Sequence, residues 1–164
     1  MEDTQKTIGI ALGGGGSLGS YEMGVWQALR ELNITPKVIT GTSIGALIGA
    51  FWASGKYEEG QSLWQNVCPE KVMKDGINFE WDSLVKTFKH ERARIVTFTK
   101  SYIKNKGADI SPFIDLIKGS ISAQEIKQAP IKFGIVAVSL PLLKQHNVVL
   151  KDVPDDEVHD WLFA

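Results

Sequence analysis

Apolar residues in the first third of the chain are grouped in the way that alternating strands and helices require. Residues 7–12 form a continuous apolar run that stops at glycine, which predicts a strand buried on both faces. Residues 20–33 carry apolar side chains at helical spacing, with Asn33 as a suitable stop. Residues 36–41 predict a second strand, and 44–54 a second helix of small residues. Short connections between these elements predict a right-handed crossover and a parallel sheet.

The rest of the chain predicts further helices and one hairpin. The predicted helices are 58–67, 81–88, 95–103, 111–119 and one that opens with a capping box at 122–125. Residues 131–140 predict a strand, and 147–150 are expected to pair with it as a hairpin. A last helix, capped by Asp155 or Asp156, is expected to be still running at Ala164.

Composition narrows the class of protein. The 164 residues are 43% hydrophobic and 23% charged, as in an average globular domain, and the net charge of −1 gives no general attraction to nucleic acid. A single cysteine, Cys68, excludes an internal disulfide framework. The longest apolar stretch, 44–55, is too short to cross a bilayer, and from the polar first residues we expect no signal peptide. We therefore expect one α/β domain over residues 1–164, located in the cytoplasm or peripherally at a membrane.

The glycines that follow the first strand have two interpretations. Gly14, Gly16 and Gly19 satisfy G-x-G-x-x-G between a strand and a helix, the fingerprint of dinucleotide binding. That interpretation also needs an acid about 20 residues further on, to hold a ribose hydroxyl. No Asp or Glu lies between Leu32 and Lys56. A nucleotide-binding domain therefore remains only the alternative.

A second motif stands where that acid is expected. Gly41, Thr42, Ser43, Ile44 and Gly45 form a G-x-S-x-G between a predicted strand and a predicted helix. In a nucleophile elbow, the serine occupies a sharp turn and the flanking glycines avoid collisions of a Cβ with neighbouring backbone. The alternative is a tight turn whose serine only caps the helix. The strand–turn–helix context favours the nucleophile.

The two motifs support one chemistry when they are taken together. Loops that follow neighbouring parallel strands lie side by side at the carboxyl edge of a sheet. The glycine loop would then present backbone N–H groups beside Ser43, where they can stabilise the oxyanion of an acyl-transfer reaction. The pair of motifs therefore predicts ester hydrolysis.

The sequence offers no convincing base for this serine. The candidates are His90, His146, His159, Asp109, Asp115, Asp152, Asp155, Asp156 and Asp160, and each fits a turn, cap or solvated position better than a catalytic one. A serine hydroxyl is a poor nucleophile without a base. The predicted site therefore has a nucleophile and an oxyanion hole, but its base is missing.

The pairing of "GGGGSLGSYEMGVWQAL" with "GTSIGALIGA" resembles the patatin-like phospholipases, of the bacterial type, in detail from Ile8 to Tyr57. The resemblance implies a three-layer α/β fold with a mainly parallel sheet. It also implies a lipid acyl hydrolase that acts on phospholipid or another lipid ester with a Ser–Asp dyad, without metal or cofactor. By this resemblance Ser43 is the nucleophile, and the N–H groups of Gly15, Gly16, Ser17 and Ile44 are the oxyanion donors.

Two departures from the family pattern matter. Leu18 stands where the family usually has Arg or Lys, which removes a charge but no N–H donor. The family's catalytic Asp lies in a D-G-[GA] motif, and the Asp75-Gly76 pair comes too early in the chain to be that motif. We therefore expect the dyad Asp beyond Ala164, and expect this chain to be the N-terminal part of the domain, incomplete at its C-terminus and inactive by itself.

Residues 71–106 hold nine of the eighteen Lys and Arg residues, mixed with aromatic residues. This segment is either a lid that settles on phospholipid or an ordinary helical insertion with solvated lysines, and the insertion is favoured. A third possibility for the whole chain is a non-catalytic fragment used for interaction.

Overall fold

The computed structural model describes residues 7–72, 109–139 and 142–164. The chain divides into two compact units, the first formed by Met1–Gln65 with Ser120–Ala164 and the second by Asn66–Gly119. The helices predicted at 81–88 and 95–103 lie outside the described residues. So do Asp75-Gly76 and, apart from its first two residues, the basic segment 71–106.

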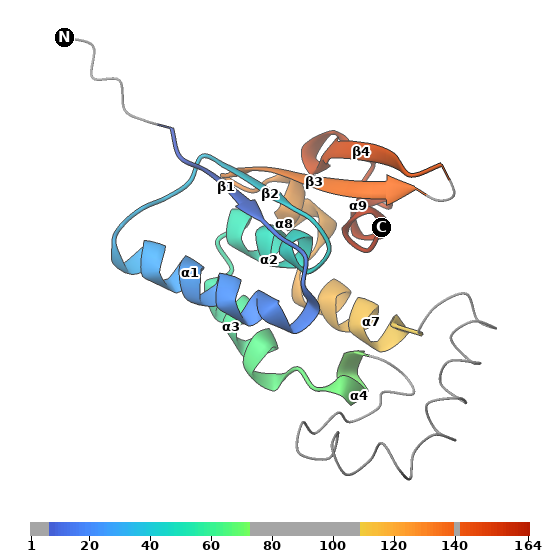
Figure 1. Ribbon diagram of the computed structural model, residues 1–164, viewed down its shortest axis with the longest axis horizontal. Coiled ribbons are helices and arrows are strands. Elements are labelled where there is room, and N and C mark those ends of the chain that lie inside the picture. Colours follow the sequence, from blue (N-terminus) through green and yellow to red (C-terminus); the bar gives the residue numbers. More distant parts are fainter. Residues whose placement is uncertain (1–6, 73–108, 140–141) are drawn as a thin grey trace. The chain divides into compact units, whose positions relative to one another are not determined.

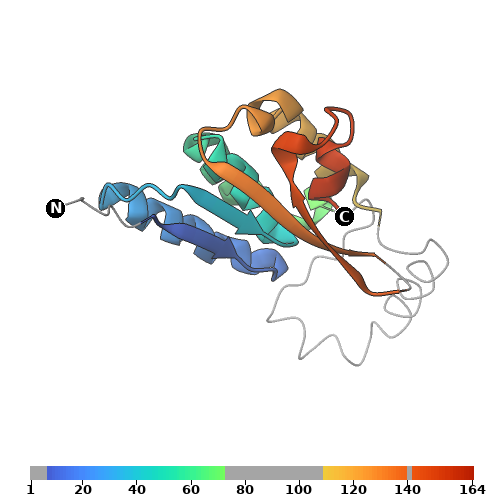
Figure 2. The same cartoon turned by 90° about the horizontal axis from the view of Figure 1, so that it is seen from above.

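The first unit is built on a four-stranded sheet (Figures 1 and 2). The strands β1 (Gly9–Leu12), β2 (Val38–Gly41), β3 (Lys132–Ser139) and β4 (Lys144–Val149) are neighbours in that order. The first three run parallel, and β4 pairs antiparallel with β3 as the predicted hairpin. Leu12 is paired with Gly41 and Gly41 with Ile135, so β1 and β2 end at the same level. The predicted α/β class with a mainly parallel sheet is confirmed.

Helices of the first unit lie along one side of this sheet (Figure 1). They are α1 (Gly19–Glu31), α2 (Ile44–Ala53), α3 (Tyr57–Asn66), α8 (Ala123–Lys127) and α9 (Val158–Leu162), with short 3-10 turns η1 (Gly16–Leu18) and η2 (Leu150–Asp152). The second unit contains α4 (Pro69–Val72) and most of α7 (Ser111–Ser120). The predicted capping box is present, because Ser122 and Glu125 exchange side-chain and backbone hydrogen bonds at the start of α8.

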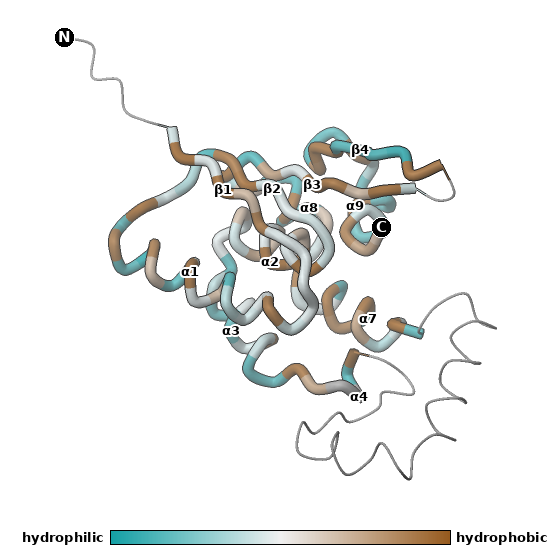
Figure 3. Tube along the Cα trace, in the orientation of Figure 1, coloured by the Kyte–Doolittle hydropathy of each residue, from teal (hydrophilic) through white to brown (hydrophobic). Residues whose placement is uncertain are grey.

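The core lies between the sheet and α2. Alternate strand residues are buried, among them Leu12, Ile39, Phe133 and Ile135. Nearly every residue of α2 is buried as well, as expected for a helix that is apolar on all sides, whereas hydropathy alternates along α1 (Figure 3). Among the described residues, helices cover one face of the sheet, and the third layer of the predicted architecture stays a prediction.

Three details of the sequence prediction are wrong. Strand β1 is not buried on both faces: Leu12 is its one buried residue, because β1 is an edge strand with helices on one side. Leu32, one of the apolar residues at helical spacing in the predicted helix 20–33, is 66% exposed just past the helix end. Glu157, whose side chain makes no capping hydrogen bond, occupies the N-cap position of helix α9, which ends at Leu162. The carboxylate of Asp155 is paired with Lys127 instead.

Candidate active site

Ser43 occupies the turn between β2 and α2 in a strained backbone conformation. Its φ of 52° and ψ of −128° lie in a region that residues other than glycine rarely adopt. The side chain is exposed, and its hydroxyl makes no capping hydrogen bond to α2. The structure therefore contradicts the alternative in which Ser43 only caps the helix, and agrees with the geometry of a nucleophile elbow.

The glycines on either side of Ser43 are required by close backbone packing. A Cβ at Gly41 would overlap the carbonyl of Gly45, at the first turn of α2. A Cβ at Gly45 would lie 2.5 Å from the Gly13 carbonyl oxygen and 2.6 Å from that of Leu12. The elbow thus packs directly against the end of β1, which explains why both positions are glycine.

Thr42 connects this turn to β1 and β3 through hydrogen bonds. Its N–H donates to the Leu12 carbonyl at 3.2 Å, and its Oγ1 donates to the Val136 carbonyl at 3.0 Å. The hydroxyl thereby extends the pairing of β2 with β3 beyond the last strand residue. The sequence placed Thr42 in the elbow, but only the register shows what its side chain does.

The glycine loop lies against Ser43, as the sequence predicts. A Cβ at Gly14 would be 3.2 Å from the Cβ of Ser43 and 3.8 Å from its Oγ. Gly15 and Gly16 have φ values of 154° and 57°, which let the chain reverse into η1. The loops that follow β1 and β2 are therefore adjacent at the carboxyl edge of the sheet.

Some N–H groups of the loop are already used. The N–H of Leu18 donates to the Gly15 carbonyl at 3.2 Å, and the N–H of Gly19 donates to the carbonyl oxygens of Gly16 and Ser17. The predicted oxyanion donors come earlier in the loop. Ile44 is the first residue of α2, where helical N–H groups have no acceptor within the helix and the helix dipole favours negative charge. The arrangement can stabilise an oxyanion formed at Ser43.

The family model of patatin-like phospholipases matches residues 10–164. The chain belongs to the patatin-like phospholipase family. It is 43% identical over 53 residues to the neuropathy target esterase sws of Drosophila sechellia, and 50% identical over 50 residues to the patatin-like phospholipase domain-containing protein ZK370.4 of Caenorhabditis elegans. These matches cover 32% and 30% of this chain, and the chain spans 4% of each relative's length.

Family membership confirms the resemblance at the level of the family and argues against a nucleotide-binding domain. Patatin-like phospholipases act on lipid esters, which is the substrate class expected from the sequence. Both relatives are animal proteins, so the bacterial type stays a prediction, as do the roles of the individual site residues.

Sequence reasoning missed one acidic residue beside the glycine loop of this patatin-like domain. The carboxylate of Glu22, in the first turn of α1, lies near the backbone N–H of Gly13. Its Oε2 is buried and has no hydrogen-bond partner among the residues that the structure describes. Burial raises the pKa of Glu22, and this N–H lowers it by less. The only signal in the sequence is the position of an acid three residues after the last loop glycine.

Four of the described candidates for a base interact with other groups: Asp109 with Ser111, Asp155 with Lys127, and the two histidines as follows. His146 Nε2 lies 3.0 Å from Ser139 Oγ, and His159 Nε2 lies 2.9 Å from the Ile121 carbonyl oxygen. Within residues 7–72, 109–139 and 142–164, no carboxylate or imidazole is hydrogen-bonded to the Ser43 hydroxyl. The same residues contain no cluster of three potential metal ligands, and none of their helices is long and apolar enough to span a bilayer.

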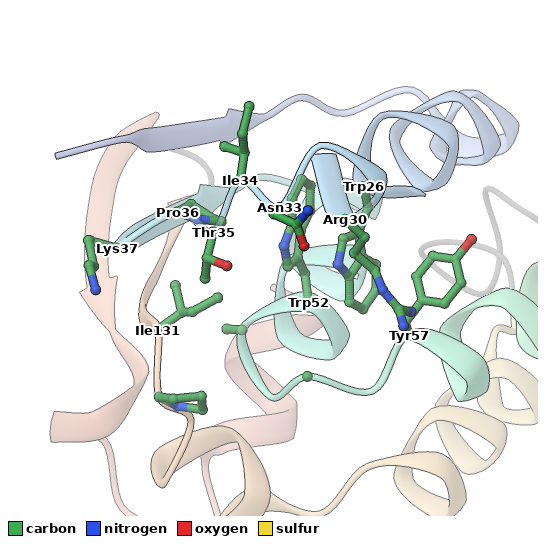
Figure 4. Close-up of a pocket in the computed structure, with 13 residues that line it drawn as sticks. Trp26, Arg30, Asn33, Ile34, Thr35, Pro36, Lys37, Trp52, Tyr57 and Ile131 are labelled. Atoms are coloured by element: carbon green, nitrogen blue, oxygen red, sulfur yellow. The ribbon is translucent and has the colours of Figure 1, made fainter. Parts of the chain in front are cut away.

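A separate cavity of about 520 Å³ lies at the opposite, amino-terminal edge of the parallel strands (Figure 4). Its wall includes Trp26, Trp52 and Tyr57, whose rings pack together, and Arg30, which stacks 4.0 Å above the Tyr57 ring. Arg30 also pairs with Glu58. No residue of the predicted site lines this cavity.

Proposed function

We propose that the chain carries the nucleophile and the oxyanion hole of a serine hydrolase that cleaves phospholipid or another lipid ester. One observation carries the proposal: the strained, exposed Ser43 stands at the N-terminus of α2 with the glycine loop packed against it. Membership of the patatin-like phospholipase family supports the choice of a lipid ester over other esters.

The reaction would proceed in two acyl transfers. Ser43 Oγ attacks the ester carbonyl and gives up its proton to a base, while the N–H groups of Gly15, Gly16, Ser17 and Ile44 bind the resulting oxyanion. Collapse of this intermediate expels the alcohol, which takes a proton from the base, and leaves an acyl-serine. Water, deprotonated by the same base, then releases the fatty acid and regenerates Ser43.

We propose that the base is an Asp located beyond Ala164, as the resemblance to the family implies. A protein that contains that residue would turn over substrate, whereas the 164-residue chain would not. The oxyanion hole needs no such partner, because its donors belong to the described loop and to α2.

The test is labelling of Ser43 with a fluorophosphonate ester in a longer protein that carries this chain. Wild type should be labelled and should hydrolyse lipid ester, and Ser43→Ala should abolish labelling and lower kcat/KM by about 10⁴-fold or more. Ser20→Ala is the matched control, because Ser20 directly follows the glycine loop but its hydroxyl donates to the Ser17 carbonyl at 3.0 Å. Labelling that persists in Ser43→Ala would refute the assignment.

A further inference from the structure

Large apolar side chains are exposed mainly around the edge that holds Ser43. Among the described residues, the exposed large hydrophobic side chains are Ile8, Leu18, Tyr21, Leu32, Val138, Leu142 and Leu143. Ile8 precedes β1 and Leu32 follows α1, so these two are remote from the carboxyl ends of the strands. The other five belong to segments at or just past those ends.

The five residues flank Ser43 from both sides. Leu18 and Tyr21, 68% and 76% exposed, follow β1 through the glycine loop and lie one helical turn apart. Val138, Leu142 and Leu143 belong to the β3–β4 hairpin. Strand β2, which ends two residues before Ser43, lies between β1 and β3. We call these five side chains the apolar rim.

The hairpin extends past the level of the nucleophile. Ile135 is paired with Gly41, the last residue of β2, and β3 continues to Ser139. Four more strand residues at about 3.3 Å each carry the end of β3 about 13 Å beyond the end of β2. The view in Figure 2 shows β3 and β4 continuing past the ends of the shorter strands. Leu142 and Leu143 stand near the tip of this projection.

Leu143 combines an unfavourable backbone conformation with an exposed apolar side chain. Its φ of 50° is a left-handed conformation that suits glycine or asparagine and is strained for a bulky side chain. Its side chain is also 71% exposed, and that of Leu142 is 85% exposed. In water, neither the left-handed backbone of Leu143 nor the exposure of these leucine side chains is favourable. Such local conflicts are expected at functional positions.

The charge of the hairpin is compatible with a phospholipid surface. Residues 132–149 contain Lys132 and Lys144 but no Asp or Glu. Lys144 is exposed and directly follows Leu143, so a cation accompanies the apolar tip. An apolar tip with a basic flank is the pattern by which peripheral proteins bury apolar side chains while a cation stays among the headgroups.

We propose that the apolar rim docks the domain onto a phospholipid bilayer, with Leu142 and Leu143 entering the boundary between headgroups and acyl chains. Leu18 and Tyr21 contact the surface on the other side of Ser43, and Tyr21 can keep its hydroxyl in the headgroup layer. The inference rests on the proposed function for its partner, a surface that contains the lipid ester. Leu18 then contributes apolar contact directly beside the glycine loop.

The experiment compares the Leu142→Asn/Leu143→Asn double variant with wild type and with Leu32→Asn, in the full-length protein. Asparagine tolerates the backbone of residue 143, and Leu32, 66% exposed, is a large exposed leucine remote from the rim. Cosedimentation with phosphatidylcholine vesicles should fall about tenfold or more in the double variant and stay unchanged in Leu32→Asn. The ratio of the rate on vesicle phospholipid to the rate on a soluble short-chain ester should fall in parallel. Thermal unfolding verifies that both variants are folded.

Equal vesicle binding by wild type and the double variant would overturn the proposal. So would wild-type dimers in light scattering that the double variant loses while neither protein binds vesicles, because the rim would then be a protein interface. Failure of the proposed function gives a different result. In that case wild type would still bind vesicles through Leu142 and Leu143, but a fluorophosphonate would not label Ser43.

Discussion

At the scale of single residues, Glu22 places a buried, unpaired carboxylate oxygen beside the loop that should bind an oxyanion. Burial raises the pKa of Glu22, and the nearby N–H of Gly13 lowers it by less. The charged form is penalised because the buried oxygen has lost water without gaining a partner. At neutral pH, Glu22 therefore lowers the stability of the fold.

This balance predicts that Glu22→Gln stabilises the protein at neutral pH. The amide has nearly the same shape but carries no charge. Because the side chain is only partly buried, solvent screening limits the gain in unfolding free energy to the order of 1 kcal/mol. The pKa of Glu22 is higher in the folded protein than in the unfolded chain. Protonated Glu22 therefore favours the folded state. This contribution to stability is complete below the unfolded pKa and is lost as pH rises through the folded pKa. The gain from Gln should accordingly vanish at acidic pH in denaturant titrations. A Glu22→Gln variant that is less stable than wild type at pH 7 would contradict this account.

The same scale shows what the sequence could and could not predict. The G-x-S-x-G motif predicted the elbow because close backbone contacts require glycine at positions 41 and 45, and these glycines can be recognised in the sequence. The hydroxyl of Thr42 reaches Val136, 94 residues away, and that contact depends on which strand lies beside β2. Glu22 could not be distinguished from an ordinary first-turn acid for a similar reason, since only the folded loop buries its oxygen.

At the scale of elements, Lys56 and the capping box join the end of α2 to the start of α8. Lys56 Nζ lies 2.8 Å from a Glu125 carboxylate oxygen and 3.1 Å from the Ser120 carbonyl. Glu125 also accepts hydrogen bonds from the N–H and hydroxyl of Ser122, each at 2.8 Å. The Lys56 ammonium, helped by these two bonds, lowers the pKa of Glu125 to about 2.

Loss of the interactions among Lys56, Ser122 and Glu125 should lower the free energy of unfolding at neutral pH. It should also reduce the decrease in stability that acid causes. Because the folded pKa of Glu125 is below the unfolded one, its contribution is present above about pH 5 and is lost as pH falls toward 2. The carboxylate is 45% exposed, so solvent screening limits the loss in Glu125→Gln to about 1 kcal/mol at pH 7. Unfolding titrations at pH 7 and pH 3 measure the effect, with Gln124→Glu as a neighbouring control outside the cluster. Equal destabilisation at both pH values would show that packing, not charge, is responsible.

The sequence predicted the helices and strands better than their burial and their contacts with distant residues. The capping box and the hairpin depend on residues close in the chain, and both are confirmed. The burial of β1 on both faces was wrong because an apolar run does not reveal that its strand stands at the edge of the sheet. The N-cap of α9 was wrong because Asp155 is paired with Lys127, a residue from another helix.

At the scale of the whole molecule, the first unit is assembled from two segments that are separated by more than fifty residues. The C-terminal segment contributes fully buried side chains, including Leu150 and Val158, and His159 bonds the Ile121 carbonyl ahead of α8. The residues around η2 and α9 are therefore part of the core that supports β3, although they are remote from Ser43 along the chain.

Truncation of Leu150 should consequently weaken the entire first unit and not only its end. Leu150 is completely buried, so Leu150→Ala should cost about 3 kcal/mol through lost transfer energy and a residual cavity. Lys151→Ala, which changes the adjacent exposed residue, should cost less than about 0.5 kcal/mol. Hydrogen exchange gives the decisive measurement. If the unit unfolds cooperatively, Leu150→Ala will speed exchange of the amides in β1 and β2 as much as those in β4, because β1–β2 and β4 then share one opening reaction. Faster exchange confined to β4 and α9 would show instead that the C-terminal segment opens independently of the strands that hold the nucleophile elbow.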